Sequence, residues 1–320
     1  MKKNLASLQL KTSSFATLAL YLCVAFFYGC GGSNSNGSGE EPVLPENVNV
    51  NANKGNAFAY GLEIPKLNSD NRFIRHSTNY NGKDITTYTM EYNDFYRHSV
   101  WIAFTFTKSV STNNWNRNNW KQTEWGGDPF QVDPQLPEIY QIKNEQHVGD
   151  GYDKGHLCAS ADRLYSKDAN EQTFYLSNIS PQLANFNQGI WANLEGLVQN
   201  WGKNDDSFRD TLFVVKGGTI KNGQRLSQTN HGLTVPKYYF IAILCKYNNS
   251  SLYRAIAFWF EHKSYGSTET VRSHAITIDE LEELTGIDFF CNLPDKIEDS
   301  VEKELNISQW PGLSLSLIHI

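Results

Sequence analysis

One segment, residues 152–195, constrains this chain more than any other because it concentrates residue types that carry out catalysis. It opens with Tyr-Asp-Lys-Gly-His and closes with Asn187 and Glu195 in a pattern typical of a helix. Histidine titrates near neutral pH, which makes His156 a natural proton acceptor. An amide and a carboxylate offer oxygen ligands to a hard cation without any cysteine. This combination suits hydrolysis of a phosphodiester.

The second half of the segment predicts a helix that starts at Asn187, because Asn is a favoured N-cap residue. Apolar residues follow it at helical spacing, namely Ile190, Trp191, Leu194, Val198 and Trp201. In a regular helix Glu195 would lie roughly 80° round from Asn187 and about 12 Å along the axis. The two side chains could then not both bind one cation directly. We therefore expect Asn187 to bind the metal and Glu195 to hold its water ligands, as Mg²⁺ prefers.

Each of these residues also has a structural interpretation. Asn187 could serve only as a helix cap, and Glu195 could be a solvated helix residue. A single histidine near glycines, such as His156, is more often a loop residue than a base. It is the conjunction of the three that favours the catalytic interpretation.

The combined motif closely resembles the signature of the DNA/RNA non-specific endonucleases, which include secreted bacterial nucleases and mitochondrial endonuclease G. That family usually has Asp-Arg-Gly-His where this chain has Asp-Lys-Gly-His, so Lys154 is a departure. The resemblance covers about residues 72–312. Its elements are residues 153–156, 178–182 and 187–195 in the motif, and residues 101–104, 117–121, 214–218, 234–240 and 284–290 around it.

The resemblance implies an α+β chain with the ββα-metal (His-Me finger) fold, in which helices flank a central, mostly antiparallel sheet and the catalytic histidine lies near a strand end. It implies an enzyme that cuts DNA and RNA with Mg²⁺, or alternatively Mn²⁺. The roles that it implies are a general base at His156, a metal site at Asn187 and Glu195, and contacts to the substrate phosphate from Lys154, Arg117 and Gln182.

The termini predict export. Residues 1–30 combine lysines with an apolar run that ends at Cys30, and residues 31–59 form a polar linker, as in a signal peptide followed by a lipid-modified cysteine. The bulky Phe27 and Tyr28 depart from the usual small residues before such a cysteine, so secretion or a periplasmic location without a lipid is the alternative. Residues 60–312 should form one nuclease domain. Residues 313–320 resemble a translated sequencing adaptor, and we exclude them from the fold.

Hydrophobic patterns predict the main elements of that domain. Residues 99–107 alternate like a half-buried strand, and residues 212–215, 238–244 and 255–260 are short apolar runs typical of a buried sheet. Residues 278–284 and 297–305 favour helices, and residues 113–135 favour a loop.

Charge and cysteines narrow the function further. The net charge of −6 comes largely from residues 279–304, and the rest of the chain is near neutral. Phosphate contacts would need a local cluster of cations, and the candidates are Arg97, Lys108, Arg117, Lys121, Lys154 and Arg163. Cys158 lies near His156, but their order does not resemble a cysteine hydrolase. The alternatives to a nuclease are a surface lipoprotein that binds nucleic acid without cutting it, and a phosphodiesterase for a smaller ester.

Overall fold

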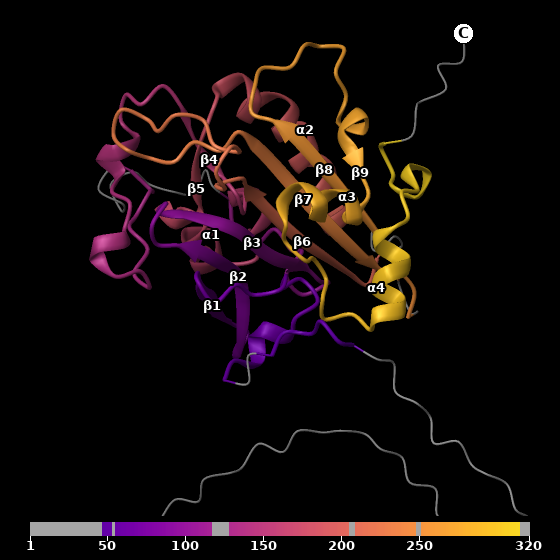
Figure 1. Ribbon diagram of the computed structural model, residues 1–320. Helices are drawn as coiled ribbons and strands as arrows, with labels where there is room; N and C mark the ends of the chain where they lie inside the picture. The colour runs from indigo at the N-terminus through magenta and orange to yellow at the C-terminus, as the bar shows by residue number, and fades with distance from the viewer. Residues whose placement is uncertain (1–46, 53–54, 117–127, 205–208, 248–250, 314–320) are drawn as a thin grey trace, which may run out of the picture. The chain divides into compact units, whose positions relative to one another are not determined.

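The computed structural model describes residues 47–52, 55–116, 128–204, 209–247 and 251–313. Their main feature is a seven-stranded antiparallel sheet with the order β1-β2-β3-β6-β7-β8-β9 (Figure 1). Its strands are Arg72–Tyr80 (β1), Lys83–Asn93 (β2), His98–Phe106 (β3), Thr211–Gly218 (β6), Tyr238–Lys246 (β7), Tyr253–Glu261 (β8) and Ala275–Ile276 (β9). A separate antiparallel ribbon pairs β4 (Asp153–His156) with β5 (Ile179–Gln182). The predicted α+β class and antiparallel sheet are confirmed.

Helices cover both faces of the sheet. The apolar side of α2 (Ala192–Gln199) packs on one face, together with the preceding turn Phe186–Trp191. On the other face lie α3 (Ile278–Thr285) and α4 (Asp295–Glu302), drawn in yellow in Figure 1. The short α1 (Lys167–Gln172) contacts β1. None of the helices in the described ranges has both the length and the apolar character needed to cross a membrane.

The strand predicted at residues 99–107 is present as β3, but the expectation that it buries only one face is wrong. Ile102 and Phe104 pack toward α2, while Trp101 and Ala103 pack toward α3 and α4. All four side chains are almost completely buried. The strand is buried on both faces because it lies inside a sheet that is covered on both sides.

Local signals account for the ends of several elements. Thr277 and Glu280 form a reciprocal capping box at the start of α3, and Gly286 ends this helix in the left-handed conformation that favours glycine. Asn81 and Gly82 both have positive φ and turn β1 into β2, which is the geometry that an Asn-Gly hairpin turn requires. The helices predicted at residues 278–284 and 297–305 correspond to α3 and α4.

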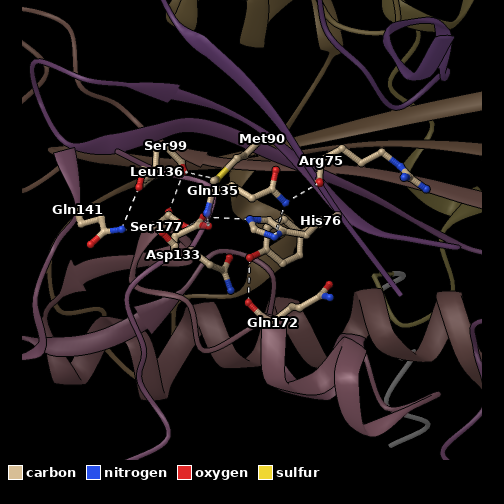
Figure 2. Close-up of polar contacts among 12 residues, drawn as sticks. Arg75, His76, Met90, Ser99, Asp133, Gln135, Leu136, Gln141, Gln172 and Ser177 are labelled. Atoms are coloured by element: carbon tan, nitrogen blue, oxygen red, sulfur yellow. Dashed lines mark hydrogen bonds and ion pairs between the residues drawn. The ribbon is translucent and has the colours of Figure 1, made fainter. Parts of the chain in front are cut away.

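A buried polar network anchors β5 to the large sheet (Figure 2). Ser99 of β3 donates to the carbonyl of Ser177, just before β5, at 2.8 Å, and the Ser177 hydroxyl donates to Asp133 at 2.6 Å. His76 of β1 contacts the same carboxylate oxygen of Asp133 at 2.9 Å and meets Gln135 through its other ring nitrogen. Burial alone would raise the pKa of Asp133, but these hydrogen bonds hold it below the usual value. Contacts from β1, from β3 and from the loop that contains Asp133 thus fix the start of β5.

Candidate active site

A cavity of about 550 Å³ opens where β4, the start of α2 and the segment after β4 meet. Five residues of the motif line it together, although the motif spans more than forty positions. The lining consists of Asn116, Phe130, Asp153, Lys154, His156, Ala159, Ser160, Ala161, Leu164, Asn187, Glu195 and Gln199. Of the six predicted site residues, the structure therefore brings His156, Lys154, Asn187 and Glu195 to one cavity.

The pairing of β4 with β5 places His156 at the end of a strand, as predicted. Asn178 fixes the chain directly after it: its side chain accepts from the NH of Cys158 at 2.7 Å and donates to the carbonyl of Cys158 at 2.9 Å. Asn178 is completely buried, so these hydrogen bonds are shielded from water. The second block of the motif therefore holds the first block in place.

The imidazole of His156 lies between two phenyl rings. Its centroid is 5.7 Å from that of Phe130 and 5.2 Å from that of Phe174, which meets the imidazole edge to face. Such packing restricts the rotation of the histidine ring. Cys158, two residues away, is buried, and burial raises the pKa of its thiol to about 12. The structure thus agrees with histidine rather than cysteine as the reactive group of this strand end. Cys158, Cys245 and Cys291 are all free thiols.

The helix after the motif does not begin at Asn187, which corrects both the predicted cap and the predicted geometry. The turn Phe186–Trp191 precedes α2, and Gly189 within it has a non-helical backbone with φ −102° and ψ −115°. Asn187 lies before this kink, with its backbone NH donating to the carbonyl of Leu183. A regular helix would separate Asn187 and Glu195 along its axis, whereas the kinked chain brings both to the cavity.

Asp153, for which no role was predicted, also lines this wall. One oxygen of its carboxylate accepts from the side-chain amides of Asn187 at 3.0 Å and Gln188 at 2.8 Å. Because Asn187 donates through Nδ2, its Oδ1 is the atom left as an oxygen ligand. The sequence signal that could have identified Asp153 is its place as the first residue of the Asp-Lys-Gly-His motif. Asp153 and His156 lie on the same short strand and both line the cavity.

Glu195 forms an ion pair with Lys216 of β6, at 2.5 Å between Oε1 and Nζ. Lys216 is almost completely buried, and its ammonium group also lies 5.3 Å from the ring centroid of Trp191. Burial raises the pKa of Glu195 above the usual value, and the charge of Lys216 opposes this shift. Lys216 was not predicted as a site residue. It directly follows the apolar run 212–215, and a lysine that continues a buried strand needs an acidic partner.

Lys154 lines the cavity but is also held by the protein. Its ammonium group donates to Asp128 at 3.2 Å and to Asn144, and it lies 4.3 Å from the ring centroid of Phe130. Partial burial works against ionisation of Asp128, but hydrogen bonds from the Phe130 NH, Asn144 and Lys154 lower its pKa below the usual value. A fixed cation therefore lies beside the histidine.

Three residues predicted to contact the substrate are not among the described residues that line the cavity. Gln182 is completely buried on β5, where its side chain fills the space over Gly155, so the prediction that it contacts substrate is wrong. A Cβ at Gly155 would lie 2.1 Å from that side chain, which explains the glycine of the motif. Arg163 is also buried, stacks over Phe104 and donates to the carbonyl of Thr105, so it is not a phosphate ligand. Arg117, like Lys121, lies outside the described residues.

The donor set suits a hard cation. The cavity wall offers an amide oxygen from Asn187 and carboxylates from Asp153 and Glu195, all oxygen ligands of the type that Mg²⁺ and Mn²⁺ prefer. No cysteine faces this wall among the residues that line the cavity. The residues present therefore fit the predicted metal, with Asp153 as an additional acidic group.

Comparisons with known proteins identify the family of this chain. The sequence profile of the DNA/RNA non-specific endonucleases matches residues 69–296. A nuclease of Nostoc sp. is 28% identical over 216 residues, covering 64% of this chain and 76% of the relative, and nuclease C1 of Cunninghamella echinulata is 28% identical over 169 residues, covering 51% and 67%. A crystal structure of the EndoG/EndoGI complex has a similar fold, with a TM-score of 0.56 at 17% identity, covering 70% of this chain and 89% of that chain. The chain belongs to the DNA/RNA non-specific endonuclease family.

Proposed function

We propose that this hydrolase is a Mg²⁺-dependent, sugar-non-specific endonuclease that uses His156 as its general base. The observation that carries the proposal is the convergence of His156, Asp153, Asn187 and Glu195 on one cavity wall. A base, an oxygen-rich metal site and an adjacent fixed cation are the groups that hydrolysis of a phosphodiester requires. The matching family supports the same reaction.

In this mechanism an imidazole nitrogen of His156 takes a proton from the attacking water. The oxygen of that water then forms a bond to phosphorus, and the bond from phosphorus to the leaving oxygen breaks. The packing of Phe130 and Phe174 against the imidazole keeps it oriented toward the cavity that both it and Asn187 line. A histidine held in this way can return the proton to the product once the bond has broken.

Asn187 would hold the metal through its amide oxygen, while Asp153 and Glu195 would accept hydrogen bonds from the metal's water ligands. The hydrogen bond from Asn187 to Asp153 orients that amide. When bound, Mg²⁺ supplies positive charge next to the phosphate and the leaving oxygen. Asp153 therefore acts as a positioning residue for Asn187.

Lys216 is a positioning residue for Glu195 in this proposal. A carboxylate that is mostly buried takes up a proton more readily, and protonated Glu195 would be a poorer acceptor. The ammonium group of Lys216, 2.5 Å away, favours the ionised form and fixes one of the two carboxylate oxygens. Glu195 itself lines the cavity.

Lys154 and Arg117 would bind the phosphate. Lys154 is a point charge where the family usually has an arginine fork, so it would position the phosphate less strictly. Arg117 follows Asn116, which lines the cavity, and this supports keeping it in the proposal. No group of the proposed mechanism reads a base, and for this reason we expect both DNA and RNA to be cut.

We also propose that the enzyme is exported and anchored by a lipid at Cys30, with secretion or a periplasmic location as the alternative. The support is the signal-like sequence of residues 1–30, which lies outside the described residues. A Cys30→Ser variant should then leave the membrane fraction, because one acylated cysteine is the proposed anchor.

The test of the function is cleavage of supercoiled plasmid and of RNA by the purified protein, with Mg²⁺ or with a chelator. We expect nicking and then degradation with Mg²⁺, and none with the chelator. A surface protein that only retains nucleic acid would shift the plasmid in a gel without cutting it. A phosphodiesterase for smaller esters would cut a small diester substrate and leave both polymers intact.

A further inference from the structure

Outside the active site, three carboxylates of the C-terminal helices converge. Asp279 and Glu282 lie on α3, Glu302 ends α4, and one oxygen from each lies within 4.8 Å of the others. None of the three forms an ion pair with a lysine or arginine in the part of the chain that the structure describes. Like charges this close repel strongly when they are shielded from water, so a compensating charge is needed.

Glu302 shows that the convergence is more than a surface accumulation of acids. Its side chain lies in the layer between α3 and α4 with only 6% of the residue exposed. Its Oε1 is buried and has no hydrogen-bond partner among the described residues. A buried carboxylate oxygen without a donor is costly unless a proton or a metal ion satisfies it.

The surrounding groups do not supply the missing charge. Asp288 and Glu298, which are also acidic, raise the pKa of Glu302 beyond the effect of its burial, which is the larger cause. Lys66 acts on Asp288 and donates to the carbonyls of Asn49 and Val50, and Lys303, which follows Glu302, pairs with Asp299 at 3.5 Å. One oxygen of Glu282 is already fixed by the NH of Phe289 at 2.6 Å, which holds that carboxylate in place.

We propose that Asp279, Glu282 and Glu302 bind a divalent cation, and that the ion is Ca²⁺. Ligands on opposite sides of one Ca²⁺ ion are up to about 5 Å apart, since each bond is about 2.3–2.6 Å, whereas the limit for Mg²⁺ is about 4.2 Å. Oxygens that all lie within 4.8 Å of one another are close enough to share one Ca²⁺ ion. Calcium also accepts irregular sets of carboxylates, with waters completing its shell.

The bound ion would clamp α3 to α4. It would also secure the chain that docks on this layer, because Val48 donates to Asp295 at the start of α4 and Asn47 donates to the carbonyl of Leu293. This role is structural and does not depend on the chemistry of the active site. The site lies in the helical layer on the opposite face of the sheet from α2.

The test is a set of thermal melts of the full chain in a calcium chelator and in about 5 mM Ca²⁺, well above the dissociation constants of weak extracellular sites. The variants are Glu302→Gln, the matched control Glu304→Gln, whose side chain is exposed on the same segment, and Asn187→Ala, which impairs the active-site metal. We expect Ca²⁺ to raise the Tm of wild type, Glu304→Gln and Asn187→Ala by about 5 °C. Glu302→Gln should shift by less than about 1 °C.

Two outcomes would overturn the proposal. One is a calcium shift in Glu302→Gln as large as that of wild type. The other is a wild-type Tm that is the same in the chelator and in Ca²⁺. Protons rather than a cation would then neutralise the three carboxylates. Plasmid cleavage by Glu302→Gln in Mg²⁺ should stay within about threefold of wild type, the range expected for a residue without a catalytic role. Failure of the calcium site would therefore leave the proposed nuclease untouched.

Discussion

Carboxylates on the two sides of the sheet have different neighbours. On the α2 side, Glu195 contacts Lys216 and Asp153 accepts from two amides. On the side of α3 and α4, Glu282 and Glu302 crowd other carboxylates, and burial followed by mutual repulsion raises their pKa values to about 7 and about 10. Acidic groups that have partners are held in place by them, whereas crowded ones need a proton or a cation.

The two sides of the sheet should therefore affect different properties of the protein. Changes on the α2 side should alter the rate of cleavage, and changes on the side of α3 and α4 should alter unfolding. The two sides share the central strands, so a variant that disturbs one side by unfolding the domain would be recognised in a thermal melt.

The largest effect should come from the general base. We expect His156→Ala to lose on the order of 10²–10⁴-fold in cleavage rate, the usual range for removing such a group. The protein should stay folded, because no hydrogen bond of the β4–β5 ladder uses this side chain. Single-turnover cleavage of a labelled oligonucleotide measures the loss. A variant within threefold of wild type would remove His156 from the mechanism.

The next effect concerns the buried ion pair. Lys216→Met should destabilise the domain by about 3–5 kcal/mol, because it leaves the Glu195 carboxylate buried without its cation. With the opposing charge gone, the pKa of Glu195 should rise further, so the acidic limb of the pH–rate profile should move to higher pH. Urea unfolding and a pH–rate profile measure the two effects.

A surface pair provides the matched control for Lys216. Lys263 contacts Glu261 at 2.8 Å, but both side chains are about half exposed. Lys263→Met should change stability far less than Lys216→Met, because water screens an exposed pair, and it should leave the pH–rate profile unchanged. Equal losses from the two substitutions would contradict the structural importance of the Lys216 pair.

A smaller effect is expected at Lys154. Lys154→Arg should keep or raise activity, and Lys154→Ala should lower it, because the position needs a positive charge and gains from a bidentate fork. Asp128 and Asn144 already hold the lysine, so the gain from arginine requires that these partners accept the larger group. Steady-state cleavage of plasmid measures both variants. An alanine variant with full activity would show that the phosphate contact was assigned wrongly.

A further effect concerns the pH dependence of stability on the side of α3 and α4. A carboxyl group whose folded pKa lies above its unfolded value binds more protons in the folded state, so stability falls as pH rises between the two values. For Glu302 this window runs from its unfolded value near 4.5 to about 10. In a chelator, stability should therefore fall as pH rises from about 5 to about 8, by at most about 1.4 kcal/mol per pH unit for this group.

Glu302→Gln removes that titration, so its stability should fall less steeply with pH than that of wild type. Urea midpoints at several pH values provide the measurement. The Glu304→Gln control should keep the wild-type slope, since that side chain is exposed. Identical slopes in all three proteins would show that Glu302 does not titrate between the folded and unfolded states.

Periodicity in the sequence predicted the buried strands well but not how they are covered. β6, β7 and β8 were expected from short apolar runs, and a helix was expected at residues 278–284, where α3 lies. The hairpin of β1 and β2 was missed because its polar residues mask the strand pattern, although Asn81-Gly82 marks its turn. The double burial of β3 depends on which elements pack on each face, and local sequence does not contain that information.

The active site shows the same division. The motif identified His156, Asn187 and Glu195, which the structure gathers in one cavity. The kink at Gly189 and the pairing of Glu195 with Lys216 arise from tertiary packing, and helical periodicity cannot reveal them. Gln182 was misassigned because a motif records which residues occur together without distinguishing those that touch substrate from those that support the strand.

The central claim is that Asn187 binds the metal directly and Glu195 acts through water, and Mg²⁺ titrations of cleavage by wild type, Asn187→Ala and Glu195→Ala test it most directly. Asn187→Ala should nearly abolish cleavage, with partial recovery only at much higher Mg²⁺. Glu195→Ala should lose about 10–100-fold and recover more readily, as is typical for groups that act on a metal through its ligands. Thermal melts of the same samples confirm folding. A folded Asn187→Ala protein with wild-type dependence on Mg²⁺ would contradict the account.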